Sequence, residues 1–193
     1  MEPIRYPLTL ASGTFAVQHL AALGAVFVPF SWPLAVMAVG LYVVRMFGVT
    51  AGYHRYFSHR AFRLGRPAQL LLAVLAQSSG QKGLLWWAAL HRDHHRHSDQ
   101  PDDIHSPVQR SFFWSHVGWV LSDRYDRYDP AKVKDLTRFP ELVWLDRFHW
   151  LPALLLAAGV ALWGALGSEG VLPALAWYAL STVLLYHGTF TIN

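Results

Sequence analysis

The 193-residue sequence contains no cysteine. Disulfide bonds, cysteine-ligated zinc sites and iron–sulfur centres are therefore excluded within this chain. Histidine, with eleven copies, is then the abundant side chain that could bind a transition metal. The positions of the histidines are consequently the first guide to a function.

Charged residues are also scarce, at 15% of the chain, whereas 53% of the residues are hydrophobic. This composition is too apolar for an ordinary soluble domain and predicts one membrane domain over residues 1–193. The excess of 16 Lys and Arg over 12 Asp and Glu does not indicate nucleic-acid binding, which needs a basic patch on a soluble fold.

Four stretches approach the roughly 20 apolar residues that cross a bilayer. They are residues 8–30, 32–53, 150–167 and 171–189. Pro29 and Pro33 separate the first pair, and the Gly-Ser-Glu-Gly run at 167–170 separates the second. The segment 54–149 carries 14 of the 16 Lys and Arg, which places it and the N-terminus in the cytoplasm. We therefore predict an all-α integral membrane protein with four transmembrane helices in two hairpins and a cytoplasmic or interfacial helical cap.

A fifth apolar region, residues 67–90, is interrupted by a polar, glycine-rich stretch at 77–83. We expect an interfacial or re-entrant helix pair there, because a full crossing would put His54 and His91 on opposite sides of the membrane. Arg45, inside the second apolar stretch, is interpreted as an anchor whose charged end reaches the membrane surface.

Two histidine clusters follow cytoplasm-pointing helices, and their spacing indicates a metal site. His91, His94 and His95 have the i, i+3, i+4 spacing of residues on one helix face. His54 and His59 would diverge by about 140° on an α-helix, so we expect the helix to end or turn between them. Each ligand ring needs an acceptor for its other nitrogen. The nearby candidates are Asp93, Asp99, Asp102 and Asp103.

Other histidine sites fit this sequence poorly. A zincin needs a glutamate directly after its first histidine, where this chain has Arg92, and the Glu-x-x-His pattern of ferritin-like sites is absent. A single histidine and arginine cluster at a membrane edge can also be only a solvated loop. Two clusters at such positions argue against that interpretation.

Four segments of the sequence resemble the acyl-CoA desaturases, a family of membrane di-iron enzymes. They are GVTAGYHRYFSH at 48–59, HRDHHRHSDQPDDIHSP at 91–107, SFFWSHVGW at 111–119 and YHGTFTIN at 186–193. The resemblance implies insertion of a cis double bond into a saturated fatty acyl-CoA, using O₂ and two electrons at two iron ions. It implies as metal ligands His54, His59, His91, His94, His95 and, through a water, Asn193.

The resemblance implies no catalytic residue beyond the metal site. Trp86 and Trp87 are candidates to line an acyl tunnel. An acidic electron donor such as ferredoxin or cytochrome b5 would meet a basic surface. We expect that surface around Arg92, Arg96, Arg110, Arg124 and Arg127. His97 and His105 are candidates to support the ligands or the fold. The histidines interpreted as structural are His19, His116, His149 and His187.

The sequence departs from the family pattern in two places. The family's next histidine would lie four residues beyond Asn193 and a third box further on, so we expect a fragment that is inactive alone, although completion by another chain is an alternative. Leu90 replaces a polar residue and puts an acyl-CoA headgroup contact there in question. The competing hypotheses are a membrane hydroxylase or alkyl oxygenase, and a non-catalytic metal-binding or scaffold protein.

Overall fold

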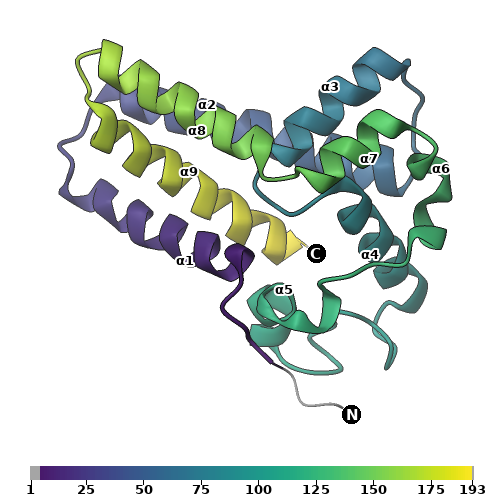
Figure 1. The fold of residues 1–193 in the computed structure, drawn as a ribbon. Helices are drawn as coiled ribbons and strands as arrows, with labels where there is room; N and C mark the ends of the chain where they lie inside the picture. Colours follow the sequence, from purple (N-terminus) through teal and green to yellow (C-terminus); the bar gives the residue numbers. More distant parts are fainter. Residues whose placement is uncertain (1–4, 193) are drawn as a thin grey trace.

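The computed structural model describes residues 5–192, and within this range every regular element is a helix (Figure 1). The α-helices are α1 Leu10–Leu23, α2 Trp32–Phe47, α3 Arg66–Gln77, α4 Leu84–His97, α5 Trp119–Leu121, α6 Lys134–Thr137, α7 Pro140–Arg147, α8 Leu151–Leu166 and α9 Val171–Ile192. The π-helices are η2 Gly48–Ser58 and η3 Trp114–Gly118. Short 3-10 helices are η1 Gly24–Phe27, η4 Asp123–Tyr125 and η5 Pro130–Val133.

Helices α1, α2, α8 and α9 occupy the four predicted apolar stretches and run side by side, with α9 packed against the other three (Figure 1). Two continuous helical segments of the described chain, Trp32–Ser58 and Val171–Thr191, are long and apolar enough to cross a membrane. A third crossing results if α7 and α8, bent by 64°, form one span. The segment Ser12–Phe27 is apolar but shorter than these helices. The location of the helical cap on the cytoplasmic side of the membrane stays a prediction.

Arg45 is buried inside the protein, so its interpretation as an anchor whose charged end reaches the membrane surface was wrong. The residue is 1% exposed and joins α2 to α9. Its guanidinium donates to Ser181 Oγ at 2.7 Å, to Thr182 Oγ1 at 2.8 Å and to the Leu41 carbonyl at 3.1 Å. It also lies 5.0 Å from the Tyr178 ring centroid. The two neighbouring hydroxyls of α9 give the buried cation partners, which removes the need to reach water.

The polar stretch at 77–83 separates α3 from α4 as predicted, and buried hydrogen bonds hold it. Gln77 is fully buried, donates to the Leu145 carbonyl at 2.9 Å and accepts from the Leu84 amide at 3.3 Å. Asp146 accepts from the Leu85 amide at 2.8 Å and so caps the start of α4 from α7. This carboxylate fills the space where a side chain at Gly83 would lie.

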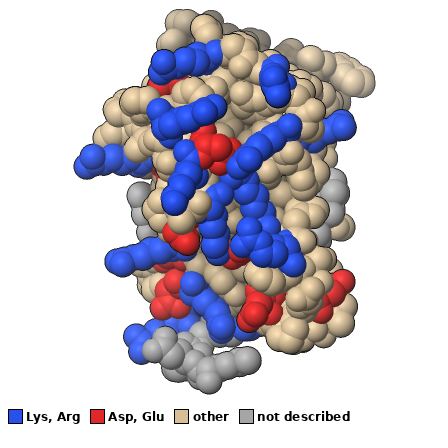
Figure 2. Space-filling model, turned by 90° about the vertical axis from the view of Figure 1, so that its right-hand side faces the viewer, with Lys and Arg blue, Asp and Glu red and all other residues tan. Residues whose placement is uncertain are grey.

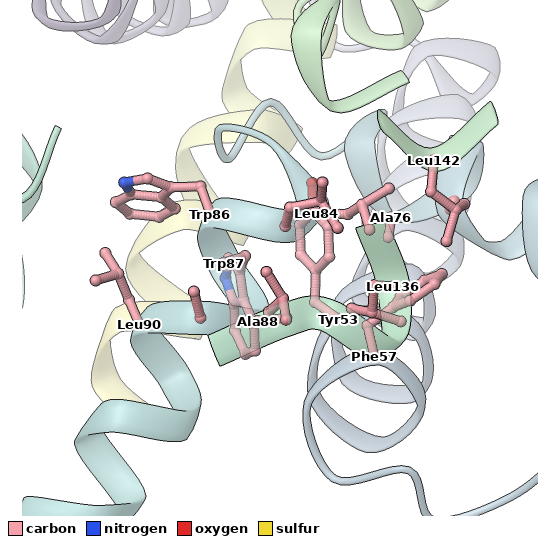
Figure 3. Packing of buried hydrophobic residues seen from close by; sticks show 14 of the residues in the cluster. Tyr53, Phe57, Ala76, Leu84, Trp86, Trp87, Ala88, Leu90, Leu136 and Leu142 are labelled. Atoms are coloured by element: carbon pink, nitrogen blue, oxygen red, sulfur yellow. The ribbon is translucent and has the colours of Figure 1, made fainter. Parts of the chain in front are cut away.

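The first half of α4 is the centre of the larger hydrophobic core. Figure 3 shows Leu84, Trp87 and Ala88 of this helix beside Tyr53 and Phe57 of η2. Each of these side chains is at most 7% exposed. The core therefore fixes α4 against η2, the two elements that carry the histidine clusters.

Candidate metal centre

The π-helix η2 brings His54 and His59 onto one face. The His59 amide donates to the His54 carbonyl at 3.1 Å, the i to i+5 bond of a π-helix. Residues five apart are then near neighbours along the helix, and the two Nε2 atoms lie 3.2 Å apart. The helix ends at Ser58, between the two histidines as expected, but the wider winding is what aligns their rings.

Four predicted ligands converge: His54, His59, His91 and His95 each place a ring nitrogen within 4.8 Å of the others. The Nε2 atom of His91 lies 3.2 Å from that of His59 and 3.0 Å from that of His95. Metal–imidazole bonds of about 2.0–2.1 Å in a tetrahedral arrangement would separate the nitrogens by about 3.4 Å. This four-histidine cluster therefore fits the first coordination sphere of one transition metal ion.

The fifth predicted ligand, His94, lies in a second group with Asp103 and His105. His94 Nδ1 donates to Asp103 Oδ1 at 2.8 Å, and its ring stacks on His105 with centroids 4.1 Å apart. The structure thus separates His94 from the four-histidine cluster, although all three α4 histidines share one side of the helix. The hydrogen bond to Asp103 leaves Nε2 of His94 available to a metal.

Of the four candidate carboxylates, Asp103 orients a predicted metal ligand, His94. Asp93 instead pairs with Lys132 and lies 3.7 Å from Arg96, and Asp99 accepts from Ser106 Oγ at 2.7 Å. The side chain of Asp103 is fully buried. Sequence spacing could not separate these four acids, because the choice depends on how the loop after α4 folds back.

Burial favours the neutral form of three rings at the site, which is the form that binds metals. Burial, reinforced by the neighbouring histidines, lowers the pKa of His91 to about 2, and burial also lowers the pKa of His95. Burial likewise lowers the pKa of His105 to about 4. Burial alone would raise the pKa of Asp103, but hydrogen bonds from His94 and two backbone amides bring it below its ordinary value. A neutral imidazole keeps the lone pair that a metal needs.

A cavity of about 710 Å³ borders the site, and most of its wall is apolar. His91 and His105 line it, as do Phe190, Tyr186 and Tyr178 along α9. Trp86 and Trp87, the candidate tunnel residues, also line this cavity. A second cavity of about 210 Å³ is lined by His54, His91, His94 and His95 together with Trp87 and Thr189. Asn193 lies outside the described residues.

The surface predicted from five arginines needs one correction. Arg92 is not a surface group, because it donates to both carboxylate oxygens of Asp135, at 2.8 and 3.0 Å, and to the carbonyls of Phe57 and Ser58. Its guanidinium ties α4 to η2 and to α6. Figure 2 shows that Lys and Arg nevertheless dominate the face that lies at the right of Figure 1. The exposed basic residues between positions 54 and 149 include three of the five predicted arginines, and together they are Arg55, Arg60, Arg63, Arg66, Arg96, Arg124, Arg127, Lys134, Arg138 and Arg147.

A model of the fatty acid desaturase family matches residues 30–193. The chain is 34% identical over 184 residues to the sn-1 stearoyl-lipid 9-desaturase of Synechocystis sp., a match that covers 93% of this chain and 55% of that protein. It is 31% identical over 184 residues to the delta(9)-fatty-acid desaturase fat-7 of Caenorhabditis elegans, covering 91% and 52%. It is 28% identical over 187 residues to a probable acyl-CoA desaturase of Schizosaccharomyces pombe, covering 93% and 38%. The chain therefore spans about half the length, or less, of these curated relatives.

Proposed function

Because the chain belongs to the fatty acid desaturase family, a family of iron-dependent membrane oxidoreductases that use oxygen, we propose that it forms the di-iron desaturation site of such an enzyme. The proposed reaction inserts a cis double bond into a saturated fatty acyl chain. The observation that carries the proposal is the four-histidine cluster at the border of a large apolar cavity.

The donor set of the site suits iron, since imidazole nitrogen is a preferred ligand of this metal. His54, His59, His91 and His95 are the proposed ligands of one ion. His94, oriented by Asp103, and Asn193, through a water, are proposed for the second. Imidazole-bound iron supplies, with O₂, the oxidising power to remove hydrogen from an unactivated methylene. The overall reaction takes two hydrogens from the chain, two electrons from a donor and two protons, and reduces O₂ to two waters.

The larger cavity is the proposed acyl site. Its wall can hold an extended hydrocarbon out of water and present one carbon–carbon bond to the metal end, where His91 lies. Trp86 and Trp87 would pack against that chain near the metal. We propose acyl-CoA or another acyl thioester as the substrate. Leu90 is 6% exposed and lines the cavity, which supports a contact with the acyl chain over one with a headgroup.

Electrons are proposed to come from an acidic cytoplasmic carrier such as ferredoxin or cytochrome b5. Arg55, Arg63, Lys134 and Arg138 are exposed and form no ion pair with any residue from 5 to 192. His59, which follows Arg55 on the same segment, is itself exposed. A negatively charged partner on this face would sit close to the metal ligands.

Product analysis tests the proposed reaction. The full-length protein would be produced in a host supplied with a labelled saturated fatty acid, and the recovered acyl chains analysed by mass spectrometry. We expect a cis alkene, and no alkene from a His91→Gln variant that accumulates to the same level. An alcohol in place of the alkene would identify a hydroxylase, and no product from a well-folded, iron-loaded protein would favour a non-catalytic metal-binding protein.

A further inference from the structure

Three histidines outside the metal centre form a continuous line of hydrogen bonds where α1, α9 and η3 meet. The Nε2 atom of His19 lies 3.0 Å from Nε2 of His187. The other nitrogen of His187, Nδ1, lies 2.9 Å from Nε2 of His116. The line ends on α1, where His19 Nδ1 lies 2.7 Å from the Phe15 carbonyl. We call this set the histidine chain.

The Phe15 carbonyl fixes the position of every proton in the neutral histidine chain. A carbonyl can only accept, so His19 must carry its proton on Nδ1 and leave Nε2 as an acceptor. His187 must then donate from Nε2, which leaves its Nδ1 to accept. His116 must donate from its own Nε2. All three rings point their protons in the same direction along the line.

The far end of the histidine chain is a free lone pair. In this arrangement Nδ1 of His116 is unprotonated, and it is buried with no hydrogen-bond partner among residues 5–192. A buried acceptor without a partner is costly and calls for an explanation. The ring is stacked on Phe112 with centroids 5.2 Å apart and lies edge-on to Phe190 at 6.0 Å. The face of an aromatic ring attracts a cation within about 6 Å of its centroid, and the stacked Phe112 ring meets this condition.

We propose that the histidine chain is a proton-binding site that takes up one proton as a unit, entering at Nδ1 of His116. This uptake breaks no hydrogen bond, because the free nitrogen is the one that gains the proton. The positive charge can then move to His187 if the shared protons shift along the line. A second proton would leave two N–H groups facing each other, so uptake stops at one.

A metal ion is a poorer occupant of the histidine chain. Metal ligands must turn one nitrogen each toward a common centre, whereas His187 uses its two nitrogens toward opposite neighbours. Among the described residues, the groups with convergent metal-ligand geometry are the two of the metal centre.

The other charged and titratable groups at this junction have their own partners. Tyr186 of α9 stacks on Phe15 and donates its hydroxyl to the Gly80 carbonyl at 3.2 Å. Arg110, next to η3, places its guanidinium 4.4 Å from the Trp114 ring centroid. No carboxylate of the described chain forms an ion pair with the three rings. The proton therefore binds beside imidazole and aromatic rings, at a site that shares no residue with the two metal-ligand groups.

Nitrogen NMR of the full-length protein, labelled with ¹⁵N-histidine, tests this proposal directly. At about pH 8, where ordinary histidines are neutral, we expect couplings across both N–H···N bonds, with protons on Nδ1 of His19 and on Nε2 of the other two rings. As the pH falls, the three rings should respond together to one proton, first at Nδ1 of His116. Three separate titrations, or a proton on Nδ1 of His116 at about pH 8, would overturn the proposal.

A variant pair sharpens the test. His187→Gln removes the middle ring, so His19 and His116 should titrate independently and both couplings should vanish. His149→Gln is the matched control, because His149 bonds to the Asp146 carbonyl and is not a member of the histidine chain. In this variant the three rings of the histidine chain should still respond together to one proton. Unchanged titration of His19 and His116 in His187→Gln would contradict the proposal. The wild-type couplings decide the question even if His187→Gln does not fold.

Discussion

The Nε2 atoms of His54 and His59 lie 3.2 Å apart although five residues separate them in sequence. Backbone winding causes this approach, because η2 is a π-helix and carries an i to i+5 bond between these residues. The ligand geometry therefore depends on whatever holds η2 against its neighbours. Gly48 and Gly52 do so by allowing close contact with α3.

Gly48→Ala should destabilise the protein by about 1–3 kcal/mol, since small-to-large changes in tight packing cost that amount. The added methyl would lie 2.9 Å from the Leu75 carbonyl oxygen and 3.1 Å from the Ala76 Cα, and backbone cannot move aside cheaply. Gly40→Ala on α2 is the control, because nothing lies within 4 Å of the added methyl. Denaturant unfolding in detergent micelles measures both. Equal stability of the two variants would contradict the packing argument.

Arg45→Lys should lower stability by about 1–3 kcal/mol, because a single ammonium cannot reproduce the planar fork of a buried guanidinium. The wild-type side chain reaches Ser181 and Thr182 at once from α2. Arg55→Lys, at an exposed position, should change stability by less than about 0.5 kcal/mol. If Arg45→Lys unfolded at the same denaturant concentration as Arg55→Lys, the α2–α9 bridge would carry no stability.

Asp103→Ala should weaken binding of the second metal ion by roughly 10–100-fold, the usual effect of losing the partner that orients a histidine ligand. Asp103→Asn keeps an oxygen for His94 Nδ1 and should lose less. Asp102→Asn is the matched control at an exposed neighbour. Cobalt titration followed by absorption measures the affinities. Identical metal affinities in Asp103→Ala and Asp102→Asn would show that Asp103 does not support metal binding.

Charge reversal on the basic face should weaken binding of the electron donor. Arg63→Glu with Lys134→Glu should raise the donor's apparent KM several-fold at low salt, and the effect should shrink as salt screens it. The pair Arg124→Glu and Arg127→Glu tests the surface expected from sequence and should have the smaller effect. Steady-state assays with the donor varied at two salt concentrations provide the measurement. If neither pair changed the apparent KM, the donor would not be an acidic carrier bound to either surface.

Sequence reasoning located the parts of the site that depend on short spacing. Apolar runs and prolines placed α1, α2, α8 and α9, because burial and helix breaking are local properties. The i, i+4 spacing of His91 and His95 correctly put both rings on one face, where their nitrogens lie 3.0 Å apart. The polar stretch at 77–83 also marked the break between α3 and α4.

The remaining features depend on contacts between distant segments. Arg45 meets hydroxyls 136 and 137 residues away, so its charge looked unpartnered in the sequence. His94 belongs to a second group with Asp103 and His105, because the loop after α4 folds back onto the helix. The spacing of the histidines on α4 does not reveal this fold. The π-winding of η2 replaces the 3.6-residue period on which the expected 140° divergence rested. The histidine chain joins three helices and has no local signal at all.

X-ray absorption of the iron-loaded full-length protein tests the central claim, that the four-histidine cluster holds iron. The wild type should show imidazole nitrogens in the first shell of iron, at a distance close to the roughly 2.0–2.1 Å of zinc–imidazole bonds. His91→Gln should lose iron and imidazole ligands, since His91 contacts the nitrogens of both His59 and His95. His149→Gln, outside the cluster, should keep both. If His91→Gln bound as much iron as the wild type, with the same number of imidazole neighbours, the cluster would not be the metal centre.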